Sequence, residues 1–195
     1  MYIHQIFIDI GQGRNFRDNP IFLKCYIENT KFILNTNFKI KIWNEKEIDL
    51  LITQHYPKYI DIINNFPNKF YKIDFVRPLI LHYNGGIYLD MDNILIELPD
   101  INRKYILANW KNEIANDLIY FNDKRIYIEY VEFMENRIEI CKMPNNWTVR
   151  RFQYCVGQKC FNQFCKKYKY LQTQNIYTSY YTSTWLKAFG KIKYY

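Results

Sequence analysis

The sequence predicts an α/β fold, because short stretches with strand patterns alternate with longer stretches that have helical spacing. Tyr2 to Ile10 is apolar and rich in β-branched residues, as expected of a strand buried in a sheet. Pro20 to Leu34 follows as an expected helix, and Asn37 to Trp43 alternates as a second strand. A chain of 195 residues without an obvious linker can fill one core, so we expect a single domain over residues 1–195.

The next elements follow from the same spacing rules. Gly11 to Asn19 is a polar loop at the carboxyl end of the first strand, where open α/β sheets receive ligands. Glu45 to Phe66 has helical spacing, with prolines as punctuation. A further helix is expected to begin at about Lys69 and to end at Gly85 and Gly86, because glycine adopts a positive φ at little cost.

The second half of the chain predicts a mixture of strands and helices. Asn93 to Leu98 is expected to continue as a strand until a proline stops it, and Tyr105 to Ala108 is a further short strand. Arg125 to Ile140 fits a helix or paired strands, and we favour the helix. The aromatic spacing after Val156 and Gly157 indicates a turn and an amphipathic helix.

The residues that suggest chemistry are concentrated between Asp74 and Asp92. Asp74 and Arg77 are three residues apart, so both side chains emerge from one face of a helix. Apolar residues then alternate with Tyr88, Asp90 and Asp92, which should point the polar set outward and place two carboxylates on the same side. Such carboxylates suit Mg²⁺ or Mn²⁺ with water and substrate phosphate, although the pair alone also fits a solvated turn.

These residues resemble the core motif of the DXD-containing sugar transferases of glycosyltransferase family 32 and of the related glucosylating clostridial toxins. The matching string is Asp74-x-x-Arg77 followed by Tyr83-x-Gly85-Gly86-Ile87-Tyr88-x-Asp90-x-Asp92. The opening Ile3-His4-Gln5-Ile6-Phe7 is similar to the "I-H-Q-x-W" first strand of that family. The resemblance implies a GT-A fold, a Rossmann-like α/β domain in which helices flank a mixed central sheet, with a nucleotide-sugar donor and a divalent metal.

The resemblance also implies roles for individual residues, with Asp74, Arg77, Asp90 and Asp92 as the catalytic set. Asp92 is the expected direct ligand of Mn²⁺ or Mg²⁺, and Asp90 the expected partner of a ribose hydroxyl and of metal-bound water. Asp74 and Arg77 resemble the pair that holds hydroxyls of the transferred sugar, and Arg77 also offsets the nearby carboxylates. The substrate-binding positions implied in the same way are His4, Gln5, Ile6, Gly86, Tyr88 against the nucleoside, Asn116, Ser183 and Trp185.

Several positions depart from the family pattern. The segment Tyr180 to Trp185 is similar to the "H-x-x-x-S-W" ending of family 32, but Tyr180 or Tyr181 replaces the histidine that would supply a third metal-side contact. Gln158 stands where the family usually has a proline. Pro78 lies inside the helix that carries the Asp-x-x-Arg pair, where it must bend the helix or remove a hydrogen bond. Without the resemblance, Asn116 would be an ordinary loop residue.

Composition excludes several other classes of protein. The chain has no apolar run of about 18 residues, so no membrane span is expected. Its start lacks a basic leader and a small-residue cleavage site, and is expected to be a strand rather than a signal peptide. The 5 cysteines lack paired spacing, so buried free thiols in a reducing compartment are expected. We therefore expect a cytoplasmic protein, in the host cytoplasm if the AT-rich composition is that of a virus.

The net charge of +8 raises the question of nucleic acid as a partner. Lys and Arg are scattered along the chain, and only the short cluster from Lys166 to Lys169 is dense. A charge cluster of this kind is more often a solvated surface than a binding site. No nucleic-acid partner is therefore expected.

Together these features predict transfer of a sugar from a UDP- or GDP-sugar to a hydroxyl of a glycan or another acceptor, with retention of anomeric configuration as in the family. One alternative is a catalytically inactive or weak relative that still binds nucleotide sugars, and another is a nucleotide-sugar hydrolase. A nucleic-acid enzyme with paired carboxylates ranks last, because no further acidic cluster in the sequence completes a two-metal site.

Overall fold

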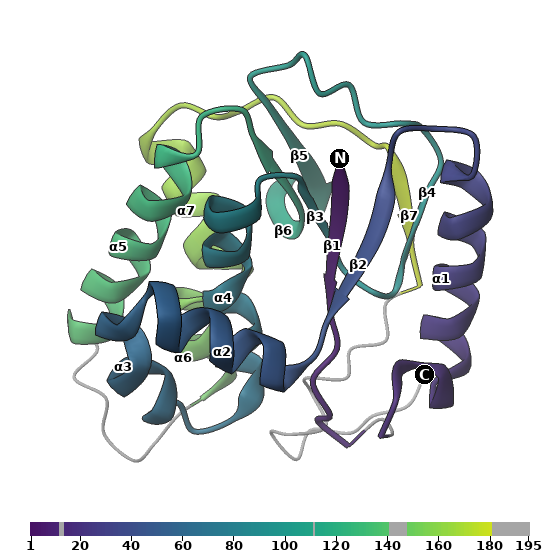
Figure 1. The fold of residues 1–195 in the computed structure, drawn as a ribbon. Coiled ribbons are helices and arrows are strands. Elements are labelled where there is room, and N and C mark those ends of the chain that lie inside the picture. The colour runs from purple at the N-terminus through teal and green to yellow at the C-terminus, as the bar shows by residue number, and fades with distance from the viewer. Residues whose placement is uncertain (12–13, 111, 141–147, 181–195) are drawn as a thin grey trace.

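A mixed five-stranded sheet forms the centre of the protein, seen in a computed structural model that describes residues 1–11, 14–110, 112–140 and 148–180. The strand order is β2-β1-β3-β6-β5 (Figure 1). The first three strands in this order are parallel, β6 is antiparallel to β3, and β5 is antiparallel to β6. Their bounds are β1 (Tyr2–Ile6), β2 (Lys39–Trp43), β3 (Ile87–Leu89), β5 (Tyr105–Trp110) and β6 (Glu113–Phe121).

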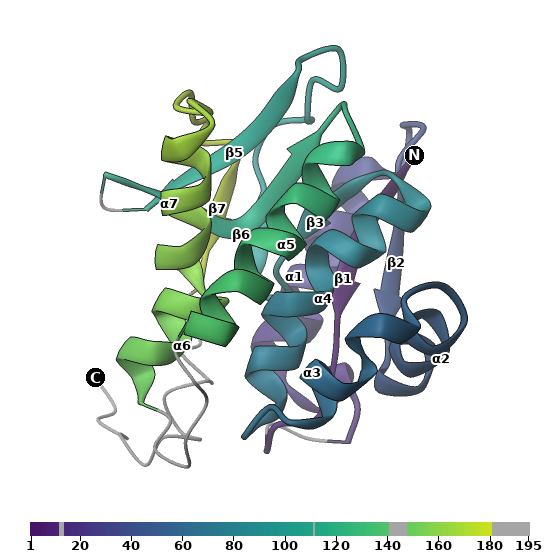
Figure 2. The same ribbon diagram turned by 90° about the vertical axis from the view of Figure 1, so that its left-hand side faces the viewer.

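Helices cover both faces of this sheet (Figures 1 and 2), which confirms the predicted α/β class with a mixed central sheet. On one face lie α1 (Pro20–Ile33) and a small sheet of β4 (Asn93–Leu95) and β7 (Tyr177–Ser179). On the other lie α4 (Lys69–Asn84), α5 (Arg125–Ile140) and α7 (Gln158–Lys167). The remaining helical elements are η1 (Phe16–Asp18), α2 (Glu45–His55), η2 (Pro57–Tyr59), α3 (Ile60–Asn64) and α6 (Val149–Cys155).

The central strand β3 is buried on both faces, which corrects the expectation that its polar side points outward. Tyr88 is only 1% exposed and packs in the core beneath α4 and α5, whereas Ile87 and Leu89 pack in the core on the opposite face. A strand between two helical layers has no solvent side, so alternation along it separates two cores. None of the helices in the described ranges is long and apolar enough to cross a bilayer.

Asparagines fix where three of the helices begin. The side chains of Asn19, Asn44 and Asn68 accept hydrogen bonds from first-turn amides of α1, α2 and α4, respectively. These caps satisfy amides that have no partner within the helix. Helix α4 runs unbroken through Pro78 and stops at Gly85, which has a φ of +69°. The chain can therefore turn at once into β3.

Gly86 sets the distance between β3 and β1. Its φ is +87°, and a Cβ added there would lie 2.5 Å from the carbonyl oxygen of Tyr2 and 2.9 Å from Nε2 of His4. Only glycine adopts this conformation without strain, and only glycine leaves room for the neighbouring strand.

Several predicted boundaries are wrong for identifiable reasons. The first strand ends at Ile6 rather than Ile10, and the predicted helix from Glu45 to Phe66 is divided at Pro57 into α2, η2 and α3. The strand predicted from Asn93 to Leu98 does not continue β3; it stops at Leu95 and pairs with β7 in a separate sheet. The predicted helices α1, α5 and α7 are present close to their expected bounds.

Candidate active site

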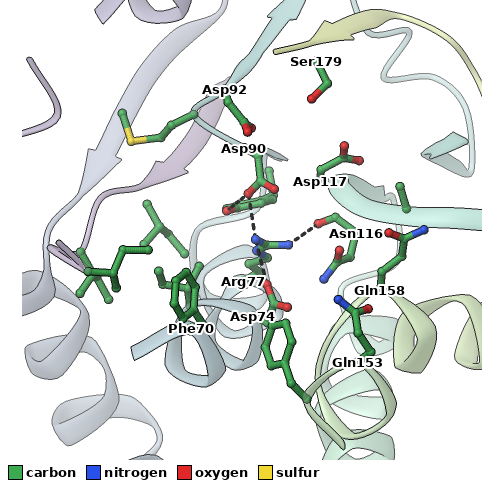
Figure 3. A pocket seen from close by; sticks show the side chains of 18 of the residues that line it. Phe70, Asp74, Arg77, Asp90, Asp92, Asn116, Asp117, Gln153, Gln158 and Ser179 are labelled. Carbon is green, nitrogen blue, oxygen red and sulfur yellow. Dashed lines mark hydrogen bonds and ion pairs between the residues drawn. The ribbon is translucent and has the colours of Figure 1, made fainter. Parts of the chain in front are cut away.

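A pocket of about 170 Å³ opens beyond the carboxyl ends of β1 and β3 (Figure 3). This is the edge where open α/β sheets place their ligands. The charged residues that line it come from three elements, namely Asp74 and Arg77 of α4, Asp90 and Asp92 after β3, and Asp117 of β6. The lining also includes apolar residues after β1, the amides Gln153 and Gln158 from α6 and α7, and Ser179 of β7.

Arg77 lies at the centre of the charged residues. Its Nη2 is 2.8 Å from Oδ1 of Asp74 and 2.9 Å from Oδ1 of Asp90, and its Nη1 donates to the carbonyl of Asn116 at 2.7 Å. The guanidinium also lies 4.7 Å from the ring centroid of Tyr88. Burial opposes its charge, but Asp74 and Asp90 outweigh this and raise the pKa of Arg77 above its ordinary value. One cation thus joins α4, the end of β3 and β6.

One carboxylate oxygen of Asp90 contacts two donor groups. The Tyr88 hydroxyl donates to Oδ1 of Asp90 at 2.6 Å, and Arg77 contacts the same oxygen. The backbone amide of Asp90 donates to the carbonyl of Asp117 at 2.8 Å, which fixes the chain at this point. Burial raises the pKa of Asp90 to about 8, with Arg77 opposing the rise and Asp92 and Asp117 adding to it.

Asp92 lines the same pocket as Asp90, as the alternation of the sequence predicts. Between them, Met91 is 5% exposed and packs against Phe7 and Phe22. Because this apolar side chain is anchored in the core, the carboxylates on either side of it are directed to the cavity. The backbone carbonyl of Asp92 accepts a hydrogen bond of 2.8 Å from the amide of Tyr180.

Asp117 is a pocket carboxylate that the sequence did not single out. The Tyr177 hydroxyl donates to its Oδ2 at 2.7 Å, and its buried Oδ1 has no hydrogen-bond partner among the described residues. Burial raises the pKa of Asp117, opposed by the Tyr177 hydrogen bond and by Arg77. The available signal was the Asn-Asp pair in an otherwise apolar segment.

A bulge in β6 explains why Asn116 and Asp117 both reach the pocket. Leu107 of β5 pairs with Ile119, but the next residue, Ala108, pairs with Ala115, so residues 116–118 have no partner in register on β5. Adjacent residues of a regular strand point to opposite faces, and a bulge re-aims them. The structure therefore places Asn116 in an irregular part of a strand rather than in the loop that its composition suggests.

His4 and Gly86, where the sequence predicts substrate contact, are not among the residues that line this pocket. His4 is 1% exposed; its Nδ1 accepts from Nε1 of Trp43 at 3.0 Å, and its Nε2 lies 2.9 Å from the carbonyl oxygen of Gly85. The proton therefore belongs on Nε2, and burial lowers the pKa of His4 to about 4. Both residues join β1 to the amino end of β3, while the pocket lies at the carboxyl end.

The remaining predicted binding residues are divided between the pocket, its support and the undescribed segment. Ile6 lines the pocket, whereas Gln5 is fully buried and its Nε2 donates to the carbonyl of Asp90 at 3.5 Å. Tyr180 has its ring 4.5 Å from the ammonium group of Lys24. The other predicted tail residues, Tyr181, Ser183 and Trp185, lie outside the described residues.

The charge balance of the pocket fits a divalent cation that is shared with a substrate. Among the described lining residues, four carboxylates face a single guanidinium. The described ranges contain no group of three or more His, Cys, Asp or Glu that could hold a metal with protein ligands alone. Mg²⁺ and Mn²⁺ typically bind one or two carboxylates and complete their coordination with water and substrate phosphates. Asp90 and Asp92 supply such a pair.

Residues 22–107, which include the Asp-x-x-Arg pair and both strand-end carboxylates, match the model of a protein family described as "Glycosyltransferase sugar-binding region containing DXD motif". A glycosyltransferase of Acanthamoeba polyphaga mimivirus is 37% identical over 93 residues, which cover 47% of this chain and 35% of the relative. The initiation-specific alpha-1,6-mannosyltransferase of Candida albicans is 26% identical over 140 residues, covering 68% of this chain and 35% of the relative. The chain is a relative of the DXD-containing glycosyltransferases.

A solved structure shows that this relationship extends to the fold. The PaToxG glycosyltransferase superposes on 86% of this chain and 68% of its own, with a TM-score of 0.54 and 16% sequence identity. The fold of the present chain is therefore of the GT-A type. A mannosyl phosphorylinositol ceramide synthase of Saccharomyces cerevisiae is also similar, with 30% identity over 92 residues, 44% of this chain and 24% of the relative. The chain spans between 24% and 39% of the length of the curated relatives that it matches.

Proposed function

We propose that this protein transfers a sugar from a nucleoside diphosphate sugar to a hydroxyl acceptor, with retention of anomeric configuration. The observation that supports this most directly is the Arg77 junction. A single buried guanidinium holds Asp74 and Asp90 on the floor of a pocket, inside the region that matches a sugar-binding family. Binding groups that are fixed before the substrate arrives lose little freedom during the reaction.

The pocket residues divide naturally between the two halves of such a donor. Asp74 is 7% exposed and forms an ion pair with Arg77, so its carboxylate can accept hydrogen bonds from hydroxyls of the transferred sugar at a fixed position. Asp90 is oriented by Arg77 and Tyr88 and lies nearer the end of β3, where it can accept a hydrogen bond from a ribose hydroxyl. Asp92 is partly exposed and is the residue best placed for a cation shared with phosphate. When bound, a divalent cation would stabilise the negative charge of the departing diphosphate.

The charges in the pocket predict that donor binding depends on a divalent cation. Asp90, Asp92 and Asp117 surround the space that a diphosphate would enter, and Arg77 already pairs with two carboxylates. Once these carboxylates are ionised they repel an anionic ligand unless a cation accompanies it, and a bound cation would itself favour the ionised form of Asp90, whose pKa burial raises to about 8. We therefore expect tight donor binding only when Mn²⁺ or Mg²⁺ is present.

The names of the relatives suggest which donors to test first. Two of them are a mannosyltransferase and a mannosyl phosphorylinositol ceramide synthase, so nucleoside diphosphate mannose heads a panel of UDP- and GDP-sugars. The assay measures release of nucleoside diphosphate with Mn²⁺ or EDTA, with and without candidate hydroxyl acceptors.

The same assay separates the alternatives. Release that requires an acceptor supports transfer, and release into water alone identifies a nucleotide-sugar hydrolase. Metal-dependent binding without release identifies an inactive binding relative. The test variant is Asp92→Asn, and its control is Asp100→Asn, because Asp100 is a surface carboxylate whose pair with Arg103 is half exposed on both sides. Donor binding that is equally tight in EDTA would contradict the metal role.

A further inference from the structure

The net positive charge of the chain lies in residues 141–195. Of the 27 Lys and Arg and the 19 Asp and Glu, residues 141–195 contain ten of the bases and none of the acids. Residues 1–140 contain the other 17 bases and all 19 acids, so this larger part is slightly acidic. Lys and Arg are spread along the whole chain, as expected, and it is the lack of Asp and Glu after residue 140 that makes this last part basic. Such asymmetry between parts of a chain indicates an interaction with an anionic partner.

The structure gathers the described part of this charge on α6, on α7 and on the turn after α7. We call Arg150, Lys159, Lys166, Lys167 and Lys169 the basic face; all five are exposed. Helix α7 turns its apolar residues inward, and Lys159, Lys166 and Lys167 lie on the opposite side at helical spacing. Figure 2 shows α7 on the outside of the molecule, with α6 beyond its lower end.

The basic face lacks the carboxylate partners found elsewhere on the protein. In the first half of the chain, Lys31, Lys41, Lys69 and Lys72 each pair with Glu or Asp. Within the described ranges, no carboxylate lies within ion-pair distance of any residue of the basic face. Its positive charge is therefore not neutralised within the part of the chain that the structure describes.

The apolar neighbours of the basic face distinguish between anionic partners. Leu171 lies two residues beyond Lys169 and is 59% exposed. Tyr168 is covered by the ammonium of Lys167, 5.2 Å from its ring centroid, and the ring of Tyr170 lies nearly parallel to it. Tyr154 is covered by Arg137 at 4.2 Å. Single-stranded nucleic acid stacks its bases on exposed aromatic faces, and Tyr154 and Tyr168, which are 41% and 37% exposed, each already have a cation over one face of the ring.

We propose that the basic face binds the surface of a membrane that contains anionic lipid, without crossing it. Lysines attract anionic head groups over a broad surface, while their long alkyl stems and a neighbouring exposed leucine enter the boundary between head groups and acyl chains. The proposal does not depend on the proposed transfer reaction. Because α6 and α7 also supply Gln153 and Gln158 to the pocket, this orientation brings the rim of the pocket towards the lipid surface.

The test is flotation of the full chain with vesicles of phosphatidylcholine, with or without phosphatidylserine. We expect binding only to the phosphatidylserine vesicles, and weaker binding as salt is raised. The test variant combines Lys159→Gln, Lys166→Gln and Lys167→Gln. It should partition about a hundredfold more weakly, because each lysine near such a surface contributes about one factor of five.

A matched control carries the same loss of charge elsewhere. It combines Lys39→Gln, Lys46→Gln and Lys104→Gln, three exposed lysines outside the basic face. Both triple variants have a formal net charge of +5 instead of +8, so overall charge cannot distinguish them. We expect the control to bind like the unaltered protein, and Leu171→Ser to bind more weakly with an unchanged salt dependence. If the first triple variant fails to fold, its three single variants provide the same comparison.

Three results would overturn the proposal. The first is no binding of the unaltered protein to phosphatidylserine vesicles at low salt. The second is equal weakening by the two triple variants, which would mean that net charge alone acts. The third is displacement from the vesicles by single-stranded RNA at low concentration, which would make nucleic acid the partner of this face. A loss of sugar transfer in Asp92→Asn with unchanged vesicle binding would leave the proposal standing.

Discussion

Replacing Arg77 by methionine tests whether the site is held together by one buried cation. Methionine fills a similar volume but leaves Asp74 and Asp90 without their shared partner. Breaking a buried ion pair by removing one member costs about 3–5 kcal/mol, since an uncompensated carboxylate remains in the protein. The side chains of Arg77 and Asp74 are only 8% and 9% exposed, so solvent screens this pair little. We therefore expect Arg77→Met to lower the free energy of unfolding by about 3–5 kcal/mol at neutral pH.

The pH dependence gives the sign of this effect independently. Burial already raises the pKa of Asp74, and Arg77 is the main charge that opposes the rise. Without Arg77 the folded-state pKa rises further above its unfolded value, so the folded variant binds protons more readily than the unfolded chain. Its stability is then greatest at low pH and is lost as pH rises through the raised pKa. The deficit relative to the unaltered protein should therefore shrink as the pH is lowered.

Urea unfolding followed by tryptophan fluorescence measures both effects. The control is Arg103→Met, because Arg103 pairs with Asp100 on the surface with both side chains 53% exposed, and such pairs are worth about 0–1 kcal/mol. Adding Asp74→Asn to Arg77→Met should recover part of the loss, because one of the two stranded carboxylates is removed. A loss below about 1 kcal/mol for Arg77→Met, or a deficit that grows at low pH, would refute the reasoning.

Three further predictions follow from other parts of the structure. The pKa of His4 is lowered from 6.5 to about 4, so the unfolded chain binds the proton first on acidification; stability is complete above pH 6.5 and falls by up to about 3 kcal/mol towards pH 4. Denaturant titrations of the unaltered protein and His4→Gln should differ in this slope, and equal slopes would show that His4 does not stay neutral when folded. Gly86→Ala should cost at least about 2 kcal/mol through its clash with β1, whereas Gly11→Ala, at a positive φ but with nothing within 4 Å, should show only the smaller backbone cost in the same unfolding measurement. Asp92→Asn should abolish most metal-dependent donor binding in calorimetry while leaving the melting temperature nearly unchanged, because a partly exposed carboxylate holds little together; a much lower melting temperature with intact binding would make Asp92 structural.

Local spacing was sufficient to predict the parts of the site that lie on single elements. Asp74 and Arg77 share a helix face because three residues make nearly one turn. Asp90 and Asp92 share the pocket because an apolar residue between them is buried. Each of these relationships depends on the geometry of one short segment, which the sequence states directly.

Long-range pairing determines the parts that the sequence did not predict. Asp117 enters the pocket through a bulge that exists only in the register of β6 against β5, and its partner Tyr177 is sixty residues away in the chain. His4 holds neighbouring segments together, because the fold brings Trp43 to one of its ring nitrogens and the carbonyl of Gly85, just after α4, to the other. A motif shared with a family names such residues without saying which of them touch the ligand and which hold the sheet.

The position of the two strand-end carboxylates is itself a product of distant segments. Beyond Leu89 the chain leaves the central sheet, yet its backbone stays fixed, since the amide of Asp90 donates to Asp117 and the carbonyl of Asp92 accepts from Tyr180. Farther along, the buried side chain of Asn29 in α1 donates to the carbonyl of Asn93 and accepts from the amide of Leu95, both at 2.8 Å. Backbone groups that are paired on several sides cannot shift singly. The geometry offered to a cation or a sugar is therefore set by β6, β7 and α1 together, and the local Asp-x-Asp sequence specifies only which atoms are presented.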